Sequence, residues 1–518
     1  MRNRLRLMIA LLGAFALAWA IHRWRSDRYD EPQFIADLPG TAAYRDEAPP
    51  PYQTRAEASA GELARLEALR DAHGGWEAWN AAVAPQRAAV HASCLRGDSG
   101  VMKSAGRLAF RKNQIGVISA PWPVPHGNDP LPMLASLSAQ LRANGIDLIV
   151  MPCPPRSLVN WADFAGSPPV PGQSINPGWY RALADLAAAD VEVIDLLSAI
   201  EAEPPGRRPA YFFPQMDEHP ADALIRLAAR LAAERLRRFP LAEWRNSPDL
   251  RRARYTFRPP DWYLEEQAGT FENRFRGEMT YVLNPDGSRL KAHPHRSDSA
   301  AQAAAHAGDG SPILVIGDSF LDTFSLEGAD FCAHLAFETG VVPRRLIAPG
   351  AAPAIQTRLA REGRAFFAGR RVCLFFFNGR ELIQPVPPAA AEQRKRWTIA
   401  PILGGEDRQD DAREYRGPIK VVAAPAIPAA ESLDYASCLG VFEAEVGGQR
   451  ALVAGWVYRG RQPAAMHAWR AGHVVAGTAI PMAEAAVEVQ NAPQIGGDSS
   501  FDLPLYFFTP DPGTPTPE

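Results

Sequence analysis

The chain has 518 residues and a formal net charge of −3, with 55 Lys and Arg against 58 Asp and Glu. This length allows several domains and a large hydrophobic core. The slightly negative charge argues against a nucleic-acid-binding protein, which would carry a basic surplus. It is compatible with a neutral or anionic polymer as substrate but predicts none.

The N-terminal 25 residues form a targeting signal. The basic stretch "MRNRLR" precedes the apolar run "LMIALLGAFALAWAI", in the order of the n- and h-regions of a signal peptide. Ala18-Trp19-Ala20 offers a cleavage site, whereas the basic stretch "HRWRSDR" directly after the run favours an uncleaved anchor. We therefore expect an exported chain, anchored to a membrane by residues 1–25, with a cleaved signal peptide as the alternative.

The next residues lead into a region where helix and strand patterns alternate. Residues 26–74 are predicted as a Pro-rich linker followed by a helix. Strands that are apolar throughout are typical of a parallel sheet covered by helices on both faces. We therefore predict one doubly wound α/β domain over residues 75–400. Its helices are expected over 134–145, 179–190, 221–239, about 321–339 and 355–367, and its strands over 146–154, 191–196, 312–317 and 371–379.

The pattern changes after residue 400. Residues 401–430 are predicted as a charged linker, and residues 509–518 as a disordered tail. Between them, over residues 431–508, short strand-like runs at 450–458, 466–472 and 485–490 are separated by Gly and Pro. This spacing is typical of a small all-β sandwich, which we interpret as an accessory domain for polymer binding or partner contact.

Aromatic residues in the second domain allow two interpretations. Trp456, Tyr458 and Trp469 lie in or beside these strand-like runs. Aromatic rings can stack on sugar rings, and Trp456 and Trp469 are therefore substrate-binding candidates. The same residues can instead fill a small core.

The cysteines do not form a metal-site pattern. No two stand in a CxxC pair and none lies in a cluster with histidines, so no metal or other cofactor is predicted. Cys153 and Cys373 lie in apolar runs, and we predict buried thiols there. An odd count leaves at least one thiol unpaired within one chain, and a single disulfide stays open. The five are Cys94, Cys153, Cys332, Cys373 and Cys438.

The stretch "PILVIGDSF" places Ser319 directly after a predicted buried strand. A strand-to-helix turn at the carboxyl edge of a parallel sheet exposes a hydroxyl and directs backbone N–H groups at the same point. Gly317 lets the backbone bend there. Ser319 is therefore a candidate nucleophile, and a turn with Asp318 as a helix cap is the alternative.

A candidate base lies upstream in "FFPQMDEHPADAL". Asp217 and His219 are two residues apart, so in an extended segment their side chains point to the same side. Asp217 could then hold one imidazole nitrogen and leave the other to act as a base toward Ser319. The alternative is a helix N-terminus, with Asp217 as the cap and Pro220 in the first turn.

Together these motifs resemble the alginate O-acetyltransferase family of the AlgJ/AlgX type, which carries an SGNH-hydrolase-like domain. The Asp-x-His motif precedes Gly-Asp-Ser-Phe, which is the family's order of Asp, His and Ser. The resemblance covers about residues 75–390. Further stretches that resemble the family are "GRLAFR", "GIDLIVMPCPPRS", "VEVIDL", "LIAPGAAPAIQTRL" and "VCLFFFNGREL".

The resemblance implies roles for individual residues. Ser319 would be the nucleophile, His219 the base and Asp217 its orienting partner. Gly350 and Asn378 are oxyanion candidates, for which an ordinary turn position is the alternative, and Arg380 is a substrate or structural contact. The sequence departs from the family at Pro220 after the histidine and in the residues around Asp217, which affects the surroundings of the substrate.

The resemblance also implies a chemistry. An acetyl group would pass through an acyl-serine onto hydroxyls of an exported polysaccharide, such as alginate or another exopolysaccharide, in the periplasm at the inner membrane. The donor would be a membrane acyltransferase partner. Two other functions stay open: a polysaccharide acetyl-esterase with the same Ser-His-Asp triad, and a non-catalytic polysaccharide-binding scaffold.

Overall fold

The structure of the chain is a computed structural model. The N-terminal targeting segment, Cys94, Asp217 and Gly350 lie outside the described residues. In the described part of the chain, no helix has the length and apolar character needed to cross a membrane. The described residues are 50–93, 95–96, 101–103, 109–111, 116–123, 129–161, 174–202, 219–220, 222–245, 262–265, 281–283, 289–292, 310–323, 330–348, 352–360, 362, 365–383, 397–402, 413–427, 429, 437–482, 485, 489, 494–495 and 503–511.

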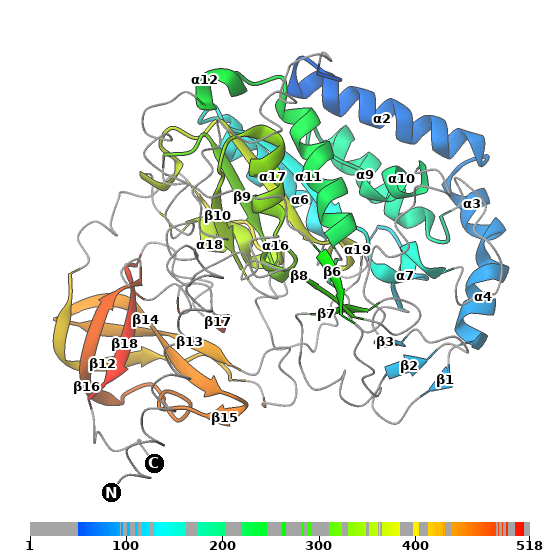
Figure 1. Ribbon diagram of the computed structural model, residues 1–518. Helices are drawn as coiled ribbons and strands as arrows, with labels where there is room; N and C mark the ends of the chain where they lie inside the picture. The colour runs from blue at the N-terminus through cyan, green and yellow to red at the C-terminus, as the bar shows by residue number, and fades with distance from the viewer. Residues whose placement is uncertain are drawn as a thin grey trace, which may run out of the picture.

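A five-stranded parallel sheet forms the centre of the larger part of the chain (Figure 1). Its strand order is β10-β9-β11-β4-β5. The register places Phe376 beside Gly317 on one side and Asn378 beside Cys153 on the other. The carboxyl ends of three neighbouring strands therefore meet at one edge. The strands are β4 (Asp147–Cys153), β5 (Glu192–Val193), β9 (Ile313–Gly317), β10 (Arg344–Ile347) and β11 (Val372–Asn378).

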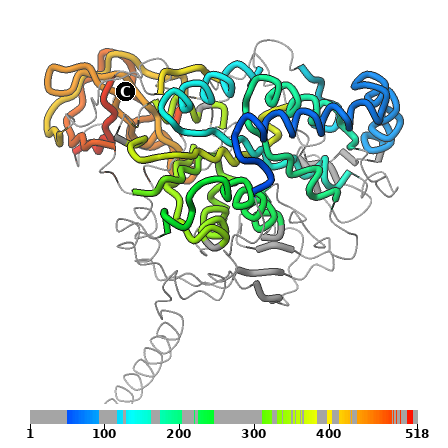
Figure 2. Tube along the Cα trace, turned by 90° about the horizontal axis from the view of Figure 1, so that it is seen from above, coloured from blue at the N-terminus to red at the C-terminus, as the bar shows by residue number. Residues whose placement is uncertain are grey.

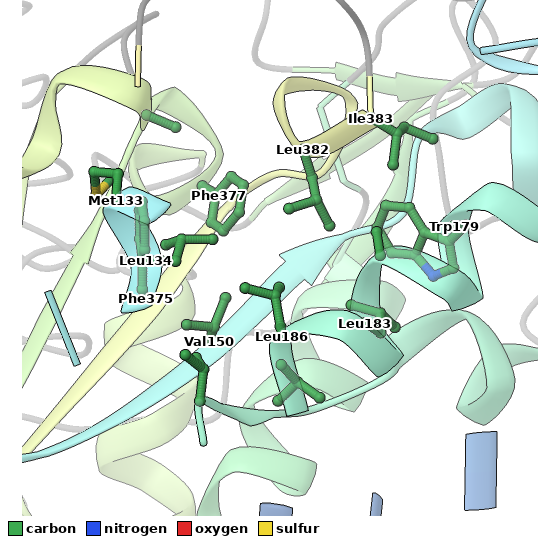
Figure 3. Packing of buried hydrophobic residues seen from close by; sticks show 14 of the residues in the cluster. Met133, Leu134, Val150, Trp179, Leu183, Leu186, Phe375, Phe377, Leu382 and Ile383 are labelled. Carbon is green, nitrogen blue, oxygen red and sulfur yellow. The ribbon is translucent and has the colours of Figure 1, made fainter. Parts of the chain in front are cut away.

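Helices cover both faces of this sheet, because alternate side chains of each strand point to opposite sides. On β11, Phe375 and Phe377 belong to one buried cluster, and Leu374 and Phe376 to the other. Figure 3 shows Phe375 and Phe377 on the face covered by α9. The predicted doubly wound parallel sheet is confirmed. The first face carries α6 (Pro130–Arg142), α9 (Pro177–Ala188) and α18 (Ile355–Ala360), and the second α11 (Asp222–Leu236) and α17 (Phe331–Thr339).

The prediction of one continuous helix over residues 321–339 is wrong. The chain forms a short α16 (Ser319–Asp322) and then α17. Thr323 ends α16 with an extended ψ of 121°, and Asp330 starts α17 by accepting a hydrogen bond from the Ala333 N–H at 2.7 Å. The predicted helix over 355–367 likewise ends early, and its last residues form a 3-10 turn at Ala365–Phe367.

The N-terminal helix α2 (Arg55–Ala72) is held to the sheet by ion pairs. Arg65 lies 2.6 Å from Asp195, which follows β5, and Arg55 lies 2.6 Å from Asp190. The helix predicted within residues 26–74 is therefore present and packs against α9 and β5.

The remaining elements are short and surround this sheet (Figure 1). They include two small three-stranded antiparallel sheets, β1-β2-β3 and β6-β8-β7. Their bounds are α3 (Trp76–Ala82), α4 (Ala84–Ser93), β1 (Leu95–Arg96), β2 (Val101–Lys103), β3 (Ala109–Arg111), α7 (Arg156–Val159), α10 (Leu196–Ala202), α12 (Leu241–Arg245), β6 (Trp262–Glu265), β7 (Tyr281–Leu283), β8 (Arg289–Ala292), η2 (Ala352–Ala354) and α19 (Arg380–Ile383).

The C-terminal strands form a closed barrel. Five of them pair in the order β12-β13-β14-β18-β16, and β16 pairs back with β12. The two edge strands β15 and β17 extend this sheet. A five-stranded Greek-key barrel is the architecture of OB folds. The bounds are β12 (Tyr415–Ala423), β13 (Cys438–Val446), β14 (Gln449–Arg459), β15 (Gln462–Pro463), β16 (Val474–Pro481), β17 (Gln494–Ile495) and β18 (Leu505–Pro510).

The barrel confirms a strand-rich second region and corrects its details. The pairing of β13 with β14 closes the sheet on itself, so the predicted sandwich-like region has the form of a closed barrel. β12 lies within the predicted linker 401–430, so that prediction is wrong over Tyr415–Ala423. Residues 466–472 form turns and not a strand. In both views the barrel and α2 lie on opposite sides of the parallel sheet (Figures 1 and 2).

Candidate active site

Ser319 lies where β9 passes into α16 at the carboxyl edge of the parallel sheet. Gly317 is the last residue of β9, and a Cβ there would overlap the carbonyl oxygen of Phe376 on β11. Glycine is therefore required for the close approach of the two strands. This approach brings the Ser319 turn beside the end of β11.

Asp318 caps the turn and also contacts the neighbouring strand. It is 3% exposed. One carboxylate oxygen accepts a hydrogen bond from the Phe320 N–H at 2.9 Å, and the other accepts one from the Asn378 N–H, also at 2.9 Å. The cap predicted as the alternative for "GDS" is therefore present. It does not conflict with the nucleophile interpretation, because Ser319 beside it faces a histidine.

That histidine is His219, which precedes α11. Its Nε2 lies 3.1 Å from the Ser319 Oγ, although the two residues are 100 positions apart in the sequence. The imidazole also contacts the Phe320 ring at a centroid distance of 5.1 Å. A hydroxyl within hydrogen-bond reach of an imidazole is the geometry of an activated serine.

The alternative interpretation of this segment was a helix N-terminus with Pro220 in the first turn. Helix α11 begins at Asp222, so Pro220 precedes the helix. Asp217 lies outside the described residues, and its role as the orienting carboxylate stays a prediction.

Burial governs the protonation of Asp318. Loss of solvent raises the pKa of its carboxyl to about 7, and the N–H groups of Asn378 and Phe320 oppose this rise. The nearby Glu381 raises the pKa further and His219 lowers it. An ionised, hydrogen-bonded carboxylate in such a place is therefore maintained only above neutral pH.

Asn378 ends β11 beside this carboxylate. It is buried, and its Oδ1 accepts a hydrogen bond from the Arg380 N–H at 3.1 Å. The side-chain oxygen is thereby the acceptor in this turn, which leaves the amide Nδ2 as the donor end. Asn378 therefore occupies a turn position, as the alternative interpretation holds. It also has an amide N–H donor, which an oxyanion role needs.

Arg380 lies in α19, two residues beyond Asn378. Its guanidinium is 3.4 Å from the Glu381 carboxylate, and both side chains are mostly buried. The placement fits a structural contact, and its role toward a substrate stays a prediction. Gly350, the other oxyanion candidate, lies outside the described residues.

The two tryptophan candidates lie in the barrel and not beside Ser319. Trp469 is 1% exposed and packs against Phe442 and Phe508 in the barrel core. Trp456 is partly buried, and the Arg459 guanidinium lies 4.9 Å from the centre of its ring. Trp469 therefore presents no ring face to solvent, as the core interpretation requires.

The thiols follow the pattern expected from the sequence. Cys153 and Cys373 are buried as predicted, and neither of these two thiols forms a disulfide. Burial raises the pKa of the Cys153 thiol well above its ordinary value, so this residue near the site is a poor nucleophile.

Part of the chain is similar to a known protein family. Residues 125–334 match the family model of the SGNH hydrolase-like domain of the acetyltransferase AlgX. The resemblance predicted from the sequence is confirmed for this segment. The AlgX-like segment contains His219 and Ser319, and it ends before β11.

Several solved structures are similar to the chain at low identity. The O-acetyltransferase domain of Pseudomonas putida AlgJ is 16% identical, with a TM-score of 0.34, covering 57% of this chain and 95% of that one. Pseudomonas aeruginosa AlgX is 13% identical, with a TM-score of 0.33, covering 77% and 88%. Bacillus cereus PatB1, solved with a sulfonyl adduct, is 12% identical, with a TM-score of 0.29, covering 56% and 96%. None of the curated proteins matches the chain.

Proposed function

We propose that the chain is an O-acetyltransferase that moves an acetyl group through an acyl-serine onto a hydroxyl of an exported polysaccharide. The observation that carries the proposal is the 3.1 Å contact between His219 Nε2 and Ser319 Oγ at the carboxyl edge of the parallel sheet. Both residues lie in the AlgX-like segment, and this match supports acetyl transfer over other serine chemistry.

In the first step, the Ser319 Oγ attacks the carbonyl carbon of an acetyl donor while His219 Nε2 takes the hydroxyl proton. The carbonyl oxygen becomes an oxyanion, and the backbone N–H of Ser319 and the Asn378 amide are the donors proposed to stabilise it. The donor's leaving group departs with the proton from His219. The product is acetyl-Ser319.

In the second step, a sugar hydroxyl attacks the acyl-serine. His219 takes the proton of that hydroxyl, the ester bond to Ser319 breaks, and the proton returns to the serine oxygen. Asp217 is proposed to hold the other imidazole nitrogen and to stabilise the imidazolium formed in both steps. The barrel is proposed as an accessory region that contacts the polymer or a partner.

The proposed setting is the periplasmic face of the inner membrane, with residues 1–25 as the anchor. The sequence of residues 1–25 supports export. Because acetyl-coenzyme A is absent outside the cytoplasm, a membrane acyltransferase partner is proposed to supply the acetyl group.

The test is acetyl transfer by the full chain, kept soluble with a mild detergent. The chain is incubated with a small acetyl ester and a panel of oligosaccharides, and both products are followed by mass spectrometry. Ser319→Ala removes the proposed nucleophile. Ser437→Ala is the matched control, since it removes a serine hydroxyl that bonds a backbone N–H in the barrel.

Acetylated sugar that disappears in Ser319→Ala and persists in Ser437→Ala is the expected result. Free acetate alone, lost in Ser319→Ala, would replace the transferase with the acetyl-esterase. If wild type and both variants gave the same amounts of acetylated sugar and of free acetate, the non-catalytic binding scaffold would be left as the function.

A further inference from the structure

The geometry points to Asp318 as a positioning residue that holds Ser319 and Asn378 in register across strands β9 and β11. This inference rests on the proposed function, in which Ser319 is the nucleophile. Its basis is that one buried carboxylate binds the backbone both in the first turn of α16 and at the end of β11, through the N–H groups of Phe320 and Asn378.

The two bonds fix the groups that act on one reacting carbonyl. The Phe320 N–H follows Ser319 directly, so the first bond fixes the turn that presents the serine hydroxyl. The Asn378 N–H belongs to the residue whose side chain is the oxyanion candidate, so the second bond fixes the end of β11. A change in either bond therefore moves the nucleophile relative to the oxyanion donor. Misplacement by about 1 Å lowers the rate of an aligned reaction by about 100-fold.

A neutral residue of the same shape cannot replace this carboxylate. Asp318→Asn exchanges one acceptor oxygen for an NH2 group, and this group would face a backbone N–H that also donates. One of the two bonds is then lost, while the size of the side chain is unchanged. Asp318→Asn therefore weakens the link between the Ser319 turn and the end of β11 without creating a cavity, which makes it the most direct single substitution for testing this role.

Several titratable groups face Asp318, and they make its role depend on pH. They are His219 before α11, Glu381 on α19 and Cys153 at the end of β4. With a pKa of about 7, the Asp318 carboxyl gains a proton as the pH falls through neutrality. The protonated carboxyl has one acceptor fewer for the two N–H groups, so we expect Ser319 to lose reactivity on acidification.

The experiment measures how fast Ser319 reacts with a fluorophosphonate probe. The serine oxygen displaces fluoride at phosphorus, and His219 takes the serine proton, which is then lost with the fluoride. The full chain in detergent is labelled at a series of pH values, and the modified residue is identified by mass spectrometry. Wild type, Asp318→Asn and Asp195→Asn are compared. Asp195 is a matched control, because it is a buried carboxylate that follows β5 in the same sheet and caps α10 through the N–H groups of Leu197 and Ser198.

We expect Asp318→Asn to label about 10- to 100-fold more slowly than wild type at pH 8, and Asp195→Asn to label at the wild-type rate. If Asp318 had a purely structural role, Asp318→Asn would lower the labelling rate of Ser319 by the same factor at every pH. A positioning role also changes the profile, because wild type loses reactivity through both Asp318 and His219, whereas Asp318→Asn loses it through His219 alone. The acidic side of the profile should therefore be less steep in Asp318→Asn.

Hydrogen exchange of peptides from β4 and β5 shows whether each variant keeps the sheet. Slow labelling of Asp318→Asn with intact protection of β4 and β5 supports the inference. Labelling at the wild-type rate over the whole pH range would overturn it and leave the proposed function in place. Slow labelling with lost protection and an unchanged profile shape would also overturn it, in favour of general destabilisation.

The two proposals fail in different ways. Rapid Ser319 labelling without acetylated sugar in the transfer assay would reject the transferase and leave the role of Asp318 standing. A wild-type Ser319 that does not react with the probe would reject both.

Discussion

Ionised Asp318 should make the folded protein less stable as the pH rises, which is the reverse of the usual behaviour of an aspartate. Its pKa is about 7 in the folded state against an ordinary value of 3.8. Between these values the folded chain holds a proton that the unfolded chain has released. The free energy of unfolding therefore falls as the pH rises through this window.

The magnitude follows from the two pKa values. One pKa unit corresponds to about 1.4 kcal/mol, so the rise from 3.8 to about 7 corresponds to about 4 kcal/mol of stability lost above neutral pH. Between pH 5 and pH 8 the linkage relation gives a loss of about 2.5 kcal/mol. Asp318→Asn cannot titrate, so this part of the pH dependence should be absent from the variant.

The assay is native-state hydrogen exchange of peptides that contain β9 and β11, measured for wild type and Asp318→Asn at pH 5 and pH 8. The variant is expected to gain about 2.5 kcal/mol relative to wild type on going from pH 5 to pH 8. Its absolute stability depends on the lost hydrogen bond, but this change with pH does not. A relative change below about 0.5 kcal/mol would refute the reasoning, because the carboxyl would then not titrate near neutrality.

Three further predictions concern packing and charge. Gly317→Ala should destabilise the sheet by about 3 kcal/mol in urea unfolding, because the new methyl group overlaps the Phe376 carbonyl. Arg238→Ala should lower the free energy of unfolding by about 3–5 kcal/mol, because it leaves the fully buried Glu192 without its partner at 2.7 Å. Trp469→Ala should destabilise the barrel by about 3–5 kcal/mol, seen as a lower melting temperature in calorimetry, while Ser319 labelling continues.

Each of these predictions has a contradicting result. Wild-type stability of Gly317→Ala would mean that β9 and β11 are farther apart than described. Glu192→Gln placed on Arg238→Ala should recover part of the loss, and no recovery would show that charge is not its cause. A Trp469→Ala protein that melts like wild type but binds oligosaccharide less tightly would favour the sugar-stacking interpretation.

The parallel sheet could be predicted because its strands are apolar on both faces. Short, continuously apolar runs that end at glycine, such as "PILVIG" and "RVCLFFFNG", are typical of buried strands. The break between α16 and α17 could not, because it depends on tertiary contacts: Arg345 binds Asp330 at 2.9 Å and Asp322 at 3.2 Å. Closure of the barrel likewise depends on which strands meet, and the spacing of strand-like runs does not specify this.

The candidate site was predictable only in part, for a similar reason. Ser319 and His219 stand out because a hydroxyl follows a strand and an Asp-x-His precedes a helix. For Asp318 the sequence indicates only a helix cap, since its second bond is made to Asn378, a residue of a different strand. The partner of a carboxylate across two strands becomes visible only when the register is known.

The strand order also has a consequence for how the chain is made. β4 and β5 are synthesised early, but the neighbour of β4 on its other side is β11, with Cys153 paired to Asn378. From Leu148 to Cys153 every side chain of β4 is buried in the finished protein. Until β11 emerges, that apolar strand has one unpaired edge, which is a template for association with other chains. The newly made protein should therefore need a holding chaperone over this interval, and fragments that end before β11 should aggregate.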